Sequence, residues 1–227
     1  FDLKAFDGKK IWCRLNKAEE NTSETGSAKK AVILSHGLTG HPNEYLHQIA
    51  RMFFAERGYD VYRFAYYNDG DDYRTLTDCT LEIHGKDLNS VIDCVQPKYE
   101  KVFVCGHSYG GLTMLFANPD VSAVSFWDSS FVPYDSFWKH CAEYVPELNC
   151  YSLKWECDFK VGKPMYDEAK SLTPEQSKEM AAVFKVPAQV VKASDNALDD
   201  NEDLFESLNT EKEFQEIVGA DHCFNKG

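Results

Sequence analysis

The sequence has few basic residues for its acidic content, no long apolar run and no Cys-x-x-Cys pair. Its 24 lysine and arginine residues stand against 37 aspartate and glutamate residues, for a formal net charge of −13. This argues against a basic surface that would attract nucleic acids or anionic membranes, so we expect neither as a partner. Apolar runs stay well below the roughly 18 residues that a membrane span needs, and we expect no span.

The eight cysteines are scattered along the chain rather than grouped in zinc-binding or thioredoxin-like motifs. We therefore expect no metal site and no cofactor. Scattered thiols are typical of a reducing compartment, which favours a cytoplasmic protein, although an even number of cysteines leaves disulfides open. They stand at Cys13, Cys79, Cys94, Cys105, Cys141, Cys150, Cys157 and Cys223.

Strand and helix patterns alternate along most of the chain. Asp7-Gly8 separates two strand-like segments and indicates a hairpin. Beyond it, short apolar runs predict strands, and apolar residues at helical spacing predict the helices between them. Such alternation predicts an α/β protein with a mostly parallel central sheet flanked by helices. The strands are expected at 31–35, 60–67, 101–105, 121–127, 188–193 and 213–218, and helices at 43–57, 88–95, 110–117, 173–184 and 204–208.

One stretch departs from this alternation. Residues 131–172 have no clear period and contain nine aromatic residues. Long irregular stretches in compact proteins are usually functional, and we interpret this one as an inserted cap. The sequence is thus divided into a core of residues 1–130 and 173–227 and a cap of residues 131–172. The aromatic rings would form the core of the cap, line an apolar pocket, or do both.

The strongest chemical signal is Gly106-His107-Ser108-Tyr109-Gly110, a G-x-S-x-G motif. It lies between a predicted strand and a predicted helix, the context in which this motif presents a nucleophilic serine on a sharp turn. Small residues on both sides of the serine permit the close backbone approach that such a turn requires. We therefore predict Ser108 as a catalytic nucleophile.

Three segments of the sequence together resemble the α/β-hydrolase family. They are Ser35-His36-Gly37-Leu38-Thr39-Gly40, the motif around Ser108, and Gly219-Ala220-Asp221-His222-Cys223-Phe224. The chain is most similar to small capped carboxylesterases of the cinnamoyl/feruloyl-esterase and monoacylglycerol-lipase kind. The resemblance implies the α/β-hydrolase fold and His222 as the catalytic base. It also implies an oxyanion hole made of the backbone N–H groups of Leu38 and Tyr109.

The family order of serine, acid and histidine implies Asp195 as the acid, because Asp195 follows the predicted strand 188–193. Family members usually carry glycine three residues before the acid, where this chain has Lys192. That departure leaves neighbouring positions open as alternatives in register. Asp128 is a second contender, because it ends an earlier strand and some members of the fold take their acid there. The alternatives in register are Asn196, Asp199 and Asp200.

The remaining histidines carry weaker signals. His36 is expected to brace its own loop, and His107 to pack beside the serine or line a pocket. The spacing of the early histidines does not suggest a metal site. We expect the other four at the surface: His41, His47, His84 and His140.

These features predict a serine hydrolase that cleaves carboxylic esters of moderately apolar or aromatic groups through an acyl-enzyme, with a small-molecule ester as its partner. The same triad serves lipases, thioesterases, peptidases and C–C hydrolases, so the pocket must decide among them. From a different class, a non-catalytic ligand-binding protein that kept the fold stays open. The sequence does not indicate an oligomeric state.

Overall fold

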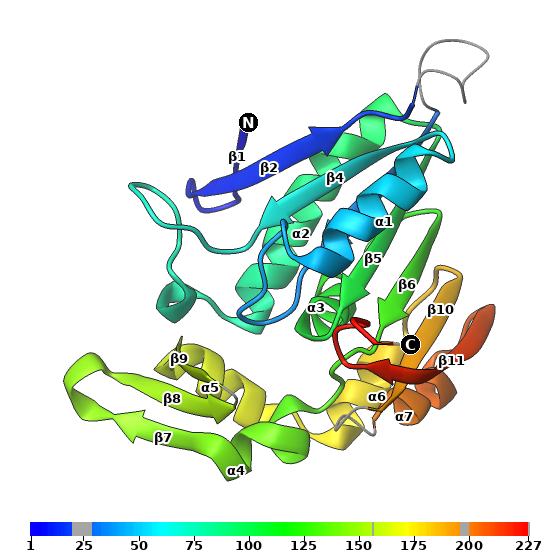
Figure 1. The fold of residues 1–227 in the computed structure, drawn as a ribbon. Helices are drawn as coiled ribbons and strands as arrows, with labels where there is room; N and C mark the ends of the chain where they lie inside the picture. Colours follow the sequence, from blue (N-terminus) through cyan, green and yellow to red (C-terminus); the bar gives the residue numbers. More distant parts are fainter. Residues whose placement is uncertain (20–28, 156, 196–199, 227) are drawn as a thin grey trace.

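The central sheet of the protein is mostly parallel, as the alternating pattern predicts. The computed structural model describes residues 1–19, 29–155, 157–195 and 200–226. Within these residues, eight strands pair in the order β1-β2-β4-β3-β5-β6-β10-β11 (Figure 1). The strands from β4 to β11 in this order run parallel, while β1 and β2 form an antiparallel hairpin at one edge. The strands are β1 (Asp2–Lys4), β2 (Lys10–Asn16), β3 (Lys30–Ser35), β4 (Tyr59–Ala65), β5 (Lys101–His107), β6 (Ala123–Trp127), β10 (Ala188–Asp195) and β11 (Lys212–Asp221).

Helices cover both faces of this sheet. Helix α1 packs on one face, and α2 and α3 pack on the other (Figure 1). Helix α6 begins with a capping box, because Thr173 Oγ1 accepts the N–H of Gln176 and Gln176 Oε1 accepts the N–H of Thr173. The helices are α1 (Tyr45–Ala55), α2 (Leu81–Val95), α3 (Tyr109–Ala117), α6 (Pro174–Ala182) and α7 (Asn201–Ser207).

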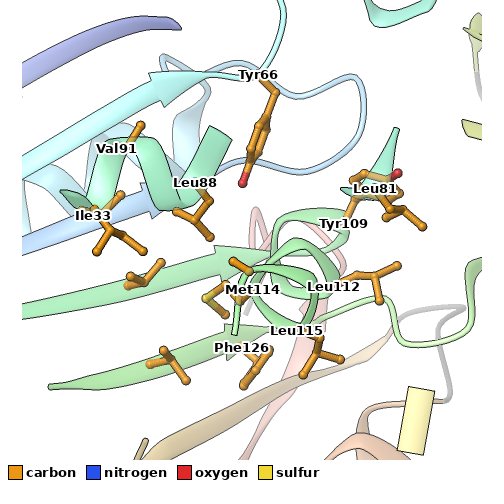
Figure 2. Packing of buried hydrophobic residues seen from close by; sticks show 14 of the residues in the cluster. Ile33, Tyr66, Leu81, Leu88, Val91, Tyr109, Leu112, Met114, Leu115 and Phe126 are labelled. Atoms are coloured by element: carbon orange, nitrogen blue, oxygen red, sulfur yellow. The ribbon is translucent and has the colours of Figure 1, made fainter. Parts of the chain in front are cut away.

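The sequence of the central strands explains why both faces are covered. Side chains alternate between the two faces of a strand, and β3 is apolar at successive positions. Val32 and Leu34 pack with Ala50 of α1, whereas Ile33 belongs to the larger cluster beneath α2 and α3. Figure 2 shows that cluster, with side chains of α2 and α3 meeting residues of β3 and β6. A strand buried on both sides holds its carboxyl end in a fixed place, and the candidate site lies at that end.

The 131–172 segment forms a small antiparallel sheet of its own (Figure 1). Its strands are short and partly exposed, which hides the period of two from the sequence. Strand β8 pairs with both neighbours, and helices flank the sheet on either side. The elements are η4 (Tyr134–Trp138), α4 (Lys139–Cys141), β7 (Ala142–Val145), β8 (Cys150–Trp155), β9 (Cys157–Gly162) and α5 (Lys163–Ser171).

Two contacts join the far side of this segment to the core. A side chain at Gly162 would collide with the carbonyl oxygen of Thr77, in the short helix η2 (Leu76–Asp78), so the backbones touch there. Glu168 of α5 accepts the N–H groups of Leu81 and Glu82, at the first turn of α2. A carboxylate satisfies the unpaired amides of a helix N-terminus and interacts favourably with its dipole. The 131–172 segment is therefore anchored to α2.

No helix within the described ranges combines the length and the apolar character needed to cross a membrane.

We predict that Glu168→Ala lowers the free energy of unfolding by about 1–3 kcal/mol, because it leaves the partly buried N–H of Leu81 without its acceptor. Urea unfolding followed by tryptophan fluorescence would measure the change. Glu179→Ala, at an exposed position on α6, is the control and should change stability by less than about 0.5 kcal/mol. Equal effects of the two substitutions would contradict the anchoring role.

Candidate active site

Ser108 occupies the turn between β5 and α3 that the G-x-S-x-G motif predicts. Its backbone has φ 53° and ψ −122°, a conformation that costs free energy for a residue with a side chain. A Cβ at Gly106 would lie 2.6 Å from the carbonyl oxygen of Gly110, and one at Gly110 would collide with that of Ser35. Only glycine fits at these two positions, so the sharp turn depends on both.

His222 follows the last strand, β11, and faces the serine. Its Nε2 lies 2.9 Å from Ser108 Oγ, and its Nδ1 lies 2.5 Å from Asp128 Oδ2. A carboxylate only accepts hydrogen bonds, so Nδ1 carries the proton and Nε2 is free to accept from the serine hydroxyl. The Asp128 carboxylate is fully buried, while 16% of the His222 side chain is exposed. The structure thus joins a hydroxyl, an imidazole and a carboxylate in one chain of hydrogen bonds.

The carboxylate at His222 is Asp128, and the expectation of Asp195 is corrected. Asp195 ends β10 as an exposed residue paired in register with Asp221. Strand β6 lies between β5 and β10. Asp128 follows β6 directly, so it lies closer than Asp195 to the turn that holds Ser108. Asp128 has φ 42°, which turns its carboxylate toward the site.

Two further donors hold the Asp128 side chain in place. Its Oδ1 accepts the N–H of Ala193 at 3.0 Å and the side-chain amide of Asn201 at 3.4 Å. Strand β10 and helix α7 therefore orient the Asp128 carboxylate through Ala193 and Asn201.

Asp200, one of the alternatives in register, contacts the start of the 131–172 segment. Its Oδ2 accepts the backbone N–H groups of Phe131 and Val132 and the hydroxyl of Ser136. Burial raises its pKa, and these donors oppose the rise. Asp200 thus fixes the first turn of the 131–172 segment rather than the imidazole. The other two alternatives, Asn196 and Asp199, lie outside the described residues.

The Ser35–Gly40 loop runs directly past Ser108. A Cβ at Gly37 would lie 3.2 Å from Ser108 Cβ, so the next residue, Leu38, comes beside the serine. Leu38 and Tyr109 both line the cavity at Ser108. Among the described residues neither backbone N–H has a hydrogen-bond acceptor. Two unpaired amides beside a nucleophile are suited to an oxyanion.

Of the other histidines, two are buried contrary to expectation. His47 and His84 are at most 1% exposed, and only His41 and His140 lie at the surface. His47 sits on the inner side of α1 beside Glu44. His84 stacks on Tyr66 at 4.3 Å between ring centroids, so aromatic packing explains its burial. Neither position carries a periodic signal, because a single polar residue on an apolar helix face resembles a surface residue.

His36 braces its loop, as expected. Its Nδ1 lies 2.8 Å from the carbonyl oxygen of Gly37, and its Nε2 accepts the N–H of Tyr66 at 3.2 Å. The carbonyl requires a proton on Nδ1, so the ring is held in one neutral tautomer. Burial lowers the pKa of His36 to about 4.

The site opens into a cavity of about 390 Å³. Its base carries Ser108 and His222, and the 131–172 segment supplies much of its wall. Trp138 stacks on Tyr109, with 6.3 Å between ring centroids and 9° between ring planes, so the wall rests on the residue that follows the nucleophile. The apolar lining consists of Leu38, Pro133, Phe137, Trp138 and Phe159.

In the part of the chain that the structure describes, no group of three or more histidine, cysteine, aspartate and glutamate side chains could hold a metal ion. Seven of the eight cysteines are described as free thiols.

We predict that His36 makes folding sensitive to acid. A histidine with a lowered pKa must be neutral in the folded state, so its contribution to stability is present above about pH 6.5 and is lost as pH falls toward 4. Between pH 7 and pH 5 this loss amounts to about 2 kcal/mol. His36→Gln, which cannot take up the proton, should show that much less decline in urea-unfolding free energy between the two pH values. Parallel declines in wild type and variant would contradict the assignment.

Part of the chain matches a known family. Residues 26–123 match the model of a hydrolase family described as serine aminopeptidase, S33. The match includes Ser108, while Asp128 and His222 lie beyond it. No curated protein matches the chain.

The chain also resembles solved structures over nearly its whole length. Est1E from Butyrivibrio proteoclasticus with bound ferulic acid has a TM-score of 0.78 at 18% identity, covering 96% of this chain and 90% of its own. An esterase domain from Rhodothermus marinus has a TM-score of 0.72 at 17% identity, covering 99% and 89%. A monoacylglycerol lipase from Paleococcus ferrophilus has a TM-score of 0.65 at 20% identity, covering 93% and 90%. This chain is therefore an α/β-hydrolase-fold protein that resembles serine hydrolases.

Proposed function

We propose that the protein is a serine esterase that cleaves carboxylic esters of moderately apolar or aromatic groups. The observation that carries the proposal is the hydrogen-bonded chain from Ser108 Oγ through His222 to Asp128, at the base of a partly apolar cavity. A serine hydroxyl is a weak nucleophile until an adjacent base takes its proton. Here that base is in contact and is itself oriented by a carboxylate, the arrangement of a catalytic triad.

In the first half of the reaction, Ser108 Oγ bonds to the ester carbonyl carbon while its proton moves to His222 Nε2. The carbonyl oxygen becomes an oxyanion, which the N–H groups of Leu38 and Tyr109 stabilise, each by about 3 kcal/mol. Collapse of the tetrahedral intermediate breaks the ester C–O bond. The leaving alkoxide takes the proton from His222, and the acyl group stays on Ser108.

In the second half, His222 takes a proton from water as the water oxygen attacks the acyl-enzyme. The intermediate collapses with loss of Ser108 Oγ, which regains the proton, and the carboxylic acid leaves. Asp128 stabilises the imidazolium in both halves and remains ionised. Every proton is returned, so the cycle needs no cofactor.

The 131–172 segment acts in this proposal as a cap that holds the acyl or aryl group. Phe137 and Phe159 face the cavity from two elements of the segment, and Leu38 faces it from the core. Such walls favour apolar groups of moderate size. Est1E, which carries ferulic acid in its structure, and the monoacylglycerol lipase support an ester substrate. The description of the matched family as an aminopeptidase keeps an amide substrate as the alternative.

We predict that Asp128, and not Asp195, is needed for catalysis. Asp128→Asn should lower kcat about 10³–10⁴-fold, because an amide does not hold the imidazole in the right tautomer or stabilise its charge. Asp195→Asn, at an exposed position, should stay within about threefold of wild type. Hydrolysis of a nitrophenyl ester measures both. A large loss in the Asp195 variant with none in the Asp128 variant would reverse the assignment.

We predict that the cavity selects esters with aromatic or medium-length acyl groups. A panel of nitrophenyl esters from acetate to decanoate, with aryl esters, a thioester and an aminoacyl nitroanilide, should give the highest kcat/KM for aryl or medium-chain esters. Ser108→Ala should lower every rate by about 10⁴-fold or more. Exclusive turnover of the nitroanilide would favour a peptidase. Equal rates in wild type and Ser108→Ala would exclude a serine mechanism.

A further inference from the structure

His222 must be held at the serine from the last strand of the sheet. Strand β11 lies at the edge, with β10 as its neighbour, and the turn after it carries His222. Bonds within the turn are local: Phe224 N–H donates to the carbonyl of Asp221, and Asn225 N–H donates to the Asp221 carboxylate. These bonds shape the turn but do not tie it to the nucleophile.

A contact across the sequence provides such a tie. His107 Nε2 lies 2.7 Å from the carbonyl oxygen of His222, although 115 positions separate the two residues. His107 is the last residue of β5 and immediately precedes Ser108. The strand that presents the nucleophile therefore also contacts the backbone of the residue that faces it.

The chemistry of the two groups fixes the direction of this bond. A backbone carbonyl only accepts, so His107 Nε2 carries a proton. The ring is 5% exposed, and burial, reinforced by the neighbouring His222, lowers its pKa to about 3. His107 is thus neutral, with its proton on Nε2. Its Nδ1 is buried without a hydrogen-bond partner.

Ring packing supports the same contact. The ring centroid of His107 lies 4.9 Å from that of His222 and 6.3 Å from that of Phe224. The His107 side chain therefore meets the turn through its ring as well as through its N–H. Both contacts restrain the position of the imidazole relative to Ser108.

We propose that His107 is a positioning residue, whose Nε2–H bond to the His222 carbonyl holds the catalytic imidazole at the serine. The inference rests on the proposed serine mechanism. His107 lines the cavity beside Ser108, but its Nε2–H donates to the backbone carbonyl of His222 and not to a reacting group. A displacement of about 1 Å at a catalytic group lowers rates by as much as 10²-fold.

Three substitutions separate the hydrogen bond from the packing. His107→Gln keeps an N–H at the same number of bonds from Cβ as Nε2. His107→Asn moves the N–H one bond closer to the backbone, and His107→Leu fills space without a donor. We expect kcat to fall about 10–100-fold in the Leu and Asn variants with KM little changed, and to stay within about fivefold in the Gln variant. His41→Gln, at an exposed histidine, is the matched control and should leave kcat unchanged.

A second readout does not depend on the identity of the substrate. The rate at which a fluorophosphonate labels Ser108 should fall in the same order as kcat, because labelling also needs the imidazole in place. Circular dichroism and urea unfolding confirm that each variant is folded under the assay conditions. If wild type is labelled but turns over no ester, the proposed esterase function fails while the labelling series still tests His107.

Three outcomes would overturn the proposal. Unchanged kcat and labelling in His107→Leu would remove any positioning role. Equal losses in the Gln and Leu variants would assign the effect to ring packing rather than to the hydrogen bond. A higher KM with unchanged kcat would make His107 a pocket-lining residue.

Discussion

The hydrogen bond between His222 and Asp128 is the interaction on which the rest of the site depends. It joins the ends of β6 and β11, which are not neighbours in the sheet, since β10 lies between them. To reach Asp128, the turn that follows β11 must cross the carboxyl end of β10. The register between β10 and β11 shifts at this place, between Ala193 and Asp195, with the extra residues on β11, and the N–H of Ala193 donates to Asp128. The strand order and the register shift therefore both contribute to the contact between His222 and Asp128.

The sequence was sufficient to predict the features that depend only on neighbouring residues. Glycine spacing predicts the turn at Ser108 because a side chain at Gly106 or Gly110 would meet backbone, and the apolar pattern of β3 predicts burial on both faces. The acid could not be selected in this way. Asp128 and Asp195 both end strands that lie on the same side of β5, and only the strand order and the left-handed backbone at Asp128 distinguish them. Lys192, in place of the expected glycine, was the one local sign that the family position is altered.

The 131–172 segment illustrates a different limit. Its strands are short and face solvent on one side, so their pattern is weak, yet an aromatic column organises the segment. Tyr109, Trp138 and Tyr166 stack in turn with interplanar angles of 9° and 16°, and Tyr151 stacks on Tyr166. Ring stacking of this kind depends on contacts between distant residues, which no period in the sequence reports. The column begins at the residue after Ser108, so the packing of this segment and the geometry of the nucleophile are coupled.

Three histidines lie near Ser108, and two of them are held neutral by burial. Burial lowers the pKa of His36 and His107 far below neutrality, and each is held in one tautomer by a backbone carbonyl. His222 differs because it is partly exposed and its Nδ1 faces a buried carboxylate. A second charged imidazole near Ser108 would disfavour the imidazolium that forms at His222, since like charges at close range repel strongly in a site of low dielectric constant. In the proposed mechanism, the neutrality of His36 and His107 is therefore a condition for His222 to act as the base, and the loop and strand that bury them would contribute to the chemistry without touching the substrate.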